Sequence, residues 1–157
     1  MTISPPAVRE AARAVVLGDH DRVLLLRYDE NGGFWATPGG SLEVGEDYTE
    51  ALLRELGEEL GLDEGVVELG PQLADRSKDH LVGGHVVRQL EKYFLIRIAA
   101  ALVDPARATQ PDTIREYRWW PLAELLTTPD AVYPEGLADL VAAVVEGRVP
   151  ERPIVLP

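Results

Sequence analysis

Three glutamates in the first half of the chain stand at a spacing that could gather a divalent cation. Glu55, Glu58 and Glu59 are three and four residues apart, and side chains at that spacing are neighbours on a helix. Like charges so placed repel one another, and in the sequence only Arg54 lies nearby to offset them. Carboxylate oxygens are the ligands that Mg²⁺ takes in proteins, together with waters and substrate phosphates. The pattern therefore indicates either a magnesium site or, as on most glutamate-bearing helices, a solvated face.

A helix with marked ends must position these glutamates. Asp47 is the expected N-cap, and Glu50, three residues later, can close a capping box. Gly61 suits the left-handed backbone that follows a last helical turn. The face expected to pack on a sheet consists of four leucines: Leu52, Leu53, Leu56 and Leu60. On a helical wheel the three glutamates fall on a separate arc, roughly opposite these leucines.

The stretch from Gly40 to Leu62 resembles the signature of the Nudix hydrolases at every defining position. Gly40 is followed by five residues, then Glu46, then seven residues, and then the run RELGEELGL over residues 54–62. The family signature has a glycine, a glutamate, an Arg-Glu pair, an aliphatic residue, a Glu-Glu pair, a glycine and an aliphatic residue at this spacing. The match spans 23 of 157 residues, and so many agreeing positions argue strongly against chance.

The resemblance implies a fold and a reaction. The fold is α/β, a Nudix-type α/β/α sandwich with a mixed central sheet and the signature helix on one face. The reaction is Mg²⁺-dependent hydrolysis of a pyrophosphate bond in a nucleoside diphosphate-X compound, such as a nucleoside triphosphate or a nucleotide sugar. Mn²⁺ is the alternative cation. The protein would then be an enzyme acting on acid anhydrides, with a small phosphorylated nucleotide as its partner.

The resemblance also implies roles for single residues. The implied catalytic residues are four: Glu55, Glu58, Glu59 and Arg54. The three glutamates would bind the metal, and the arginine would hold a signature carboxylate by a charge-assisted hydrogen bond. The turn at Gly39 and Gly40 lets the backbone come close to a metal or phosphate, and one of these carbonyls can be a ligand. Glu46 would bind the metal through water or stabilise its loop.

The general base is left open between a signature glutamate and an acid elsewhere. Four acids outside the signature are candidates: Glu91, Glu116, Asp79 and Asp112. The first two rank higher because they fall in expected strands. A second class of function, a non-catalytic nucleotide-sensing module that regulates a partner, fits less well because a binder has no need of all three glutamates. Hydrolysis of 5′ RNA ends is a third hypothesis.

Composition bounds these hypotheses. The chain has 157 residues, 46% of them hydrophobic, which suits a single domain over residues 1–157 with extended ends at 1–6 and 148–157. The net charge of −12 argues against broad binding to DNA, RNA or anionic membranes. The absence of cysteine excludes disulfides and favours the reducing cytoplasm. No apolar run has the length of a membrane span. Homodimers are frequent among similar proteins, so a homodimer is a further expectation.

The remaining elements are predicted from periodicity and breakers. Two strands, 9–17 and 22–28, should form a hairpin, with Arg13 and Arg27 at an edge or facing outward rather than in a cleft. The elements expected after the signature helix are a strand 65–73, a mobile loop 74–84 over the cleft, strands 85–103 and 113–120, and helices 121–126 and 135–146.

Four further side chains have predicted positions. Trp35 should pack in the core, and Trp119 and Trp120 should point to opposite faces of their strand. For Asp130 and Tyr133, packing and turn chemistry are favoured over binding of a nucleotide base.

Overall fold

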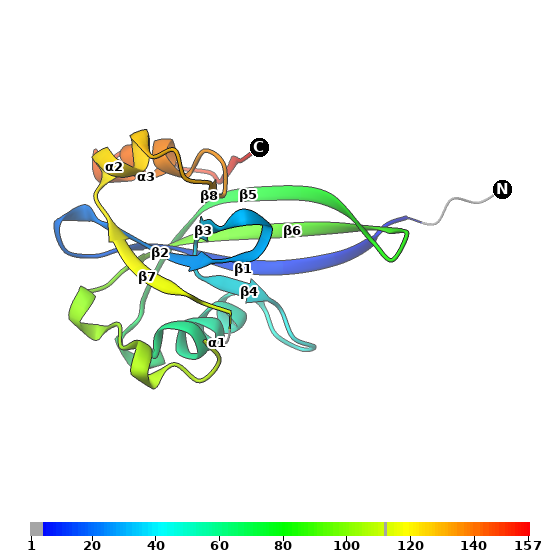
Figure 1. Cartoon of the computed structure of the whole chain (residues 1–157), viewed down its shortest axis with the longest axis horizontal. Helices are drawn as coiled ribbons and strands as arrows, with labels where there is room; N and C mark the ends of the chain where they lie inside the picture. Colours follow the sequence, from blue (N-terminus) through cyan, green and yellow to red (C-terminus); the bar gives the residue numbers. More distant parts are fainter. Residues whose placement is uncertain (1–4, 112) are drawn as a thin grey trace.

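A mixed sheet forms the middle layer of the protein, with helices on both of its faces. The computed structural model describes residues 5–111 and 113–157. In these residues the sheet has nine strands: β1 (Ala7–Leu17), β2 (Val23–Tyr28), β3 (Phe34–Ala36), β4 (Gly39–Ser41), β5 (Glu68–Val82), β6 (His85–Arg97), β7 (Glu116–Trp120), β8 (Val132–Tyr133) and β9 (Ile154–Val155). Helix α1 (Tyr48–Leu60) covers one face, and α2 (Leu122–Thr127) and α3 (Leu137–Val145) cover the other (Figure 1). The predicted α/β sandwich is confirmed. None of the described helices is long and apolar enough to cross a membrane.

Alternation along the central strands supplies one hydrophobic core to each face. Val15 of β1 and Leu25 of β2 join the cluster beneath α2 and α3, whereas Val16 and Leu24 join the cluster beneath α1. Successive side chains of a strand point to opposite faces, so each strand fills both cores. The predicted hairpin of residues 9–28 is present, and β1 also pairs in parallel with β6 along its whole length.

Helix α1 begins and ends where its sequence predicts. The Asp47 side chain accepts a hydrogen bond from the Glu50 N–H at 2.8 Å, and the Glu50 carboxylate accepts one from the Asp47 N–H at 3.2 Å. Gly61 has φ +66°. The predicted arrangement of the glutamates is wrong in one respect: Glu59 is buried, with 7% of its surface exposed. It follows Leu52 by seven residues, about two turns, and therefore shares the leucine side of the helix.

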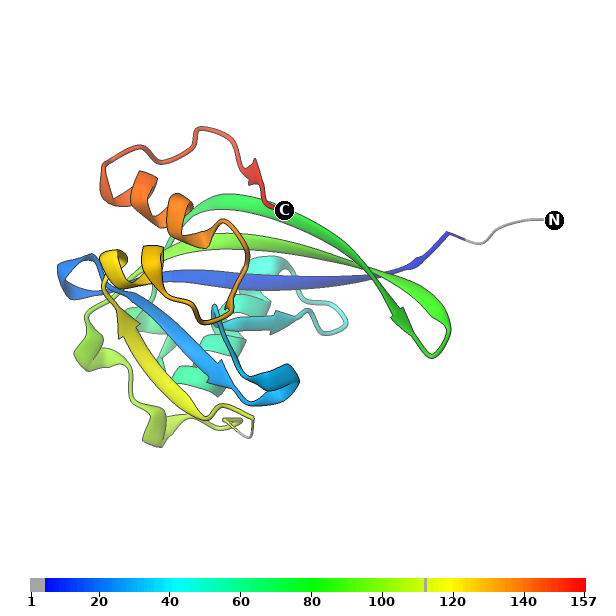
Figure 2. The ribbon, with the colours of Figure 1, turned by 45° about the horizontal axis from the view of Figure 1, so that its top comes forward.

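The prediction of a mobile loop over residues 74–84 is wrong. These residues form the second half of β5 and a tight turn at Gly83 and Gly84, both with positive φ. The second half of β5 lies beyond the helices, as Figure 2 shows, so polar residues occupy both of its faces and the apolar alternation of a strand is missing. The predicted strand 85–103 is also too long, because β6 ends at Arg97.

Three strands continue together past the helices and form a projecting arm. The arm consists of residues 7–10 of β1, 76–82 of β5 and 85–90 of β6. Figures 1 and 2 show these strands extending well beyond the rest of the sheet. Two strands seldom hold together in water without support, and the third strand here supplies additional backbone hydrogen bonds.

The last residues of the chain form a strap along β5. Strand β9 pairs in parallel with Ala74 and Asp75, and the Leu156 N–H donates to the Asp75 carbonyl at 2.9 Å. Leu156 inserts into the core beneath α3 with 5% of its surface exposed, whereas the neighbouring Val155 is 81% exposed.

We expect Leu156→Ala to lower the free energy of unfolding by about 2–5 kcal/mol, because it opens a cavity in a packed core. The matched change Val155→Ala should alter it by less than about 0.5 kcal/mol, since that side chain faces solvent. Urea unfolding followed by tryptophan fluorescence measures both. Equal effects of the two substitutions would show that the strap is not docked.

Candidate active site

The guanidinium of Arg54 gathers the acidic side chains around the start of α1. It donates to both oxygens of Glu46, at 2.8 and 2.9 Å, and to one oxygen each of Glu55 and Glu58, at 3.1 Å. A further bond, at 3.0 Å, reaches the Ser41 carbonyl of β4. The hydrogen bond with Glu46 is the largest of the effects that raise the pKa of Arg54. One cation thus offsets the repulsion between the glutamates that the sequence leaves unexplained.

Glu59 is held separately, against the glycine turn. The Gly39 N–H donates to one of its carboxylate oxygens at 2.8 Å, and the Tyr28 hydroxyl donates to the other at 3.3 Å. Burial raises the pKa of Glu59 to about 7, because the charged form loses its hydration, and the Gly39 N–H offsets only part of that effect. Burial also raises the pKa of Glu55.

The glycine turn fits these carboxylates only because it lacks side chains. Gly39 has φ +135°, which disfavours any other residue. A Cβ on Gly40 would lie 2.5 Å from a carboxylate oxygen of Glu55. The carboxylate of Glu55 therefore packs directly on the backbone of β4, as the signature glycine requires.

The donor atoms suit a hard cation, although they are not gathered around one point. Among the described residues, no three His, Cys, Asp or Glu side chains converge on a common position. Glu55 and Glu58 each bind Arg54 through one oxygen, and their other oxygens accept no hydrogen bond from the described part of the chain. Each of the two glutamates thus keeps one carboxylate oxygen available, the carboxylate of Glu55 lies against Gly40, and oxygen is the ligand type that Mg²⁺ prefers.

A cavity of about 740 Å³ opens on the other side of the glycine turn. Its aromatic wall consists of Tyr28, Phe34 and Tyr133: the first two rings stack at 5.3 Å, and Phe34 meets Tyr133 edge-on at 5.6 Å. No signature glutamate lines this cavity. Tyr28 connects the cavity with the signature helix, because its ring lines the cavity and its hydroxyl donates to Glu59. The size and aromatic lining are those of a site for a small organic ligand.

A buried ion-pair network forms the polar wall of the same cavity. Glu91 accepts from Arg13 Nε at 2.9 Å and from Arg76 Nη1 at 2.7 Å, and it is 5% exposed. Arg13 also donates to the Gly39 carbonyl at 2.9 Å, and Arg76 to the Pro157 carbonyl of the strap at 3.0 Å. Burial alone would raise the pKa of Glu91, but the two arginines outweigh it and lower that pKa.

The four acids proposed outside the signature therefore lie in unlike places. Glu91 lines the cavity, but its ion pairs keep it charged, which suits positioning of arginines better than acceptance of a proton. Asp79 is exposed on the arm and paired with Arg88, and Glu116 is exposed on β7. Asp112 lies outside the described residues.

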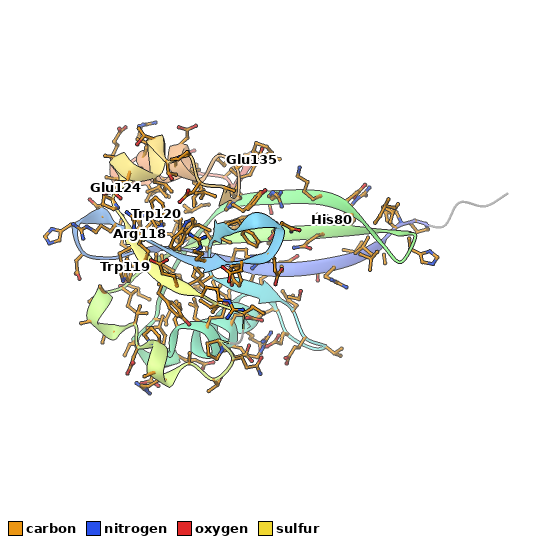
Figure 3. All side chains as sticks on the ribbon, viewed as in Figure 1. His80, Arg118, Trp119, Trp120, Glu124 and Glu135 are labelled. Atoms are coloured by element: carbon orange, nitrogen blue, oxygen red, sulfur yellow. The ribbon has the colours of Figure 1, made fainter. Side chains whose placement is uncertain are left out.

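The structure changes the prediction for Arg13 and supports those for the tryptophans. Arg13 faces the cavity rather than an edge or the solvent. Trp35 is buried, and its indole N–H donates to Asp130 at 3.3 Å. Trp120 is buried in the core beneath α2 and α3, whereas Trp119 is partly buried against the core beneath α1, so the two rings lie on opposite faces of the sheet (Figure 3).

Several cavity residues were not singled out from the sequence. Among them are Tyr28, Phe34 and Arg76. For Arg76 a signal existed, because Arg76, Lys78 and His80 alternate with period two, as on one face of a strand. The assignment of residues 74–84 to a loop concealed it.

We expect Glu91→Gln to lower the free energy of unfolding by about 3 kcal/mol near pH 7, because two largely buried guanidinium groups lose their anion. The folded-state pKa of Glu91 lies below the ordinary carboxyl value of 4.5. Its contribution is therefore complete above pH 4.5 and is lost as the pH falls through the folded-state pKa. Urea unfolding at several pH values should show the difference between wild type and variant narrowing in acid.

The exposed Glu116→Gln is the matched control and should leave stability within about 0.5 kcal/mol of wild type. A difference between wild type and Glu91→Gln that persists unchanged below the folded-state pKa would contradict the ion-pair explanation.

Comparisons with known proteins agree with this geometry. The family model described as NUDIX domain matches residues 7–141. An RNA pyrophosphohydrolase of Sphingopyxis alaskensis is 32% identical over 107 residues, which are 63% of this chain and 68% of that protein. An RNA pyrophosphohydrolase of Teredinibacter turnerae is 31% identical over 146 residues, 82% of each chain.

A solved structure shares the fold. The crystal structure of the MutT protein from Methanosarcina mazei Go1 is similar with a TM-score of 0.65 at 21% identity, and the match covers 92% of this chain and 98% of that one. The signature, the mixed sheet and the family match lead to one conclusion. The chain belongs to the Nudix family and is an enzyme of its pyrophosphohydrolase class.

Proposed function

We propose that the protein hydrolyses a pyrophosphate bond of a nucleoside diphosphate derivative, with Mg²⁺ as the cation. The observation that supports this most directly is the position of the cavity. Arg13, which lines the cavity, donates to the Gly39 carbonyl, and the same glycine turn contacts Glu59 and Glu55. A nucleoside bound in the cavity would place its phosphates between the arginines and the signature helix.

The signature glutamates are the proposed metal ligands. Glu55, Glu58 and Glu59 supply hard oxygen donors, and a carbonyl of the glycine turn can add another. A bound divalent cation would neutralise the diphosphate and polarise the phosphoryl group under attack. The proposed part of Arg54 is positional: it holds Glu55 and Glu58 through one oxygen each and leaves the other oxygen of each for the metal, and it fixes the loop through both oxygens of Glu46.

The cavity residues are proposed to bind the nucleotide. Arg13 and Arg76 each use Nε and Nη1 in the ion-pair network, and their Nη2 groups donate to no acceptor in the described residues. A guanidinium has five N–H donors and suits phosphate oxygens. The base would stack on Tyr133, whose ring is exposed at the cavity wall. The non-catalytic alternative is less well supported, because the complete signature and its supporting arginine are both present.

We expect Glu58→Gln and Glu59→Gln each to lower metal-dependent hydrolysis at least about 100-fold, since each removes charge that would stabilise the transition state. Substrate loss and product formation should be measured across a panel of nucleoside triphosphates and nucleotide sugars with Mg²⁺ and Mn²⁺, and the products identified. Mn²⁺ binding followed by electron paramagnetic resonance gives a second readout, and it should weaken in both variants.

Glu68→Gln, an exposed glutamate on β5, is the control and should keep both turnover and Mn²⁺ affinity. Unchanged turnover in Glu58→Gln would refute the assigned role.

We expect Tyr133→Ala to raise KM about fivefold or more, because stacking of a base on an aromatic ring contributes about 1–3 kcal/mol. Tyr133→Phe keeps the ring and should leave KM unchanged. Steady-state kinetics on the best substrate of the panel separates the two. If both variants behave alike, the base does not stack at this wall.

A further inference from the structure

The strap is anchored to the rest of the protein by a single buried side chain. Leu156 is 5% exposed, Pro150 is half-buried, and the other residues from 146 to 157 are exposed. Strand β9 has two residues and is the last strand in the order of the sheet, where it pairs with β5. Figure 2 shows it at the margin of the sheet, next to β5. A segment with so little buried surface opens locally with a low free energy.

The strap end, Leu156 and Pro157, contacts the polar wall of the cavity. The Pro157 carbonyl accepts a hydrogen bond from Arg76 Nε at 3.0 Å, and Nη1 of the same guanidinium donates to Glu91 at 2.7 Å. The donors of a guanidinium form a rigid planar fork, so two bonds fix the direction of the remaining N–H groups. Arg76 is 13% exposed and lines the cavity. Release of the strap would therefore leave its guanidinium with the bond to Glu91 and free to change its plane.

The strap end also contacts the segment that carries the aromatic wall. Tyr133 and Pro134 line the cavity, and Gly136 follows them directly before α3. The backbone of Gly136 packs on the strap end: a Cβ there would lie 3.3 Å from Cδ2 of Leu156 and 3.7 Å from Cδ of Pro157. The segment is thus held by the pairing of β8 with β3 on one side and by the strap on the other.

Two walls from distant parts of the chain therefore depend on one short contact. Arg76 belongs to β5, and Tyr133 belongs to the segment before α3. Neither Leu156 nor Pro157 lines the cavity, so the strap end touches the two walls from behind. A ligand that contacts both walls binds more tightly when both are in place, and by linkage it favours the docked strap to the same extent.

We propose that Leu156 and Pro157 are positioning residues for the cavity, and that docking of the strap and binding of a nucleotide strengthen each other. This inference rests on the proposed function, because it takes the cavity as the nucleotide site. A strap with only a structural role would close the hydrophobic core and leave the affinity of the cavity unchanged. The two roles therefore differ in their effect on KM.

The kinetic test compares three alanine substitutions. Leu156→Ala removes the anchor of the strap. Leu125→Ala, in α2, removes the same kind of side chain from the same core, where Leu125 is also 5% exposed. Val155→Ala changes the exposed neighbour of the anchor. The variants are assayed with Mg²⁺ on the best substrate of the panel, at a temperature where circular dichroism shows all of them to be folded.

Leu156→Ala should raise KM about tenfold if the strap is then docked in about a tenth of the molecules. Its kcat should stay within about twofold of wild type, because saturating substrate selects the docked form. Leu125→Ala and Val155→Ala should both keep the wild-type KM. An unchanged KM in Leu156→Ala, or an equal rise in Leu125→Ala, overturns the proposal.

The second test measures the reciprocal effect in the wild-type protein and requires no variant. The Leu156 N–H donates to the Asp75 carbonyl, so its hydrogen exchange reports opening of the strap. The probes are the α,β-methylene diphosphates of adenosine, guanosine, cytidine and uridine, whose carbon bridge is not hydrolysed. At saturation this exchange should slow at least about fivefold, because the coupling is reciprocal. The Ala100 N–H, which donates to Asp19, is the reference and should keep its rate.

The two tests distinguish failure of this proposal from failure of the proposed function. Hydrolysis together with unchanged exchange at Leu156, or with equal slowing at Leu156 and Ala100, overturns the positioning role and leaves the hydrolase standing. Slowed exchange at Leu156 alone, without hydrolysis of any compound in the panel, supports the coupling and rejects the proposed function. Failure of all four probes to bind overturns the coupling, whereas the hydrolase assay is decided separately.

Discussion

One guanidinium holds the acidic side of the site together. Arg54 binds Glu46 through two hydrogen bonds, Glu55 and Glu58 through one each, and the Ser41 carbonyl of β4. Without this cation, carboxylates from the loop and the helix would repel one another at the point where the chain must run close to the sheet. The loop, the helix and the strand are thus fixed relative to each other by a charge at their centre.

The glycine turn joins this acidic side to the cavity. The N–H of Gly39 is bound by Glu59, and its carbonyl is bound by Arg13, which in turn meets Glu91. A single residue of backbone therefore sets the distance between the proposed metal ligands and the arginines that would meet the substrate. Any side chain at this position would push against β1, so the connection depends on glycine. Phosphoryl transfer is catalysed mainly by positioning and by charge, and it therefore requires that the proposed metal ligands and the arginines be held rigidly relative to each other.

Charge is distributed in this protein by strand pairing rather than by composition. The net charge of −12 describes the chain as a whole. The parallel pairing of β1 with β6, and the antiparallel pairing of β5 with β6, bring cations from two separate segments to one face. A function that depends on a local potential cannot be excluded on net charge alone, because the field near a ligand comes from the nearest groups and more distant ones are screened.

The sequence by itself determined the features that depend on near neighbours. The capped ends of α1, the glycine turn, the first hairpin and the spacing of Glu55, Glu58 and Glu59 all follow from local backbone and periodicity. Only the tertiary structure decided which distant segments meet. Arg13 and Glu91 are 78 positions apart and became partners through the pairing of β1 with β6. The burial of Glu59 and the strand at residues 76–82 also had no sufficient local signal. Burial depends on what packs against a side chain, and a strand with solvent on both faces needs no apolar alternation.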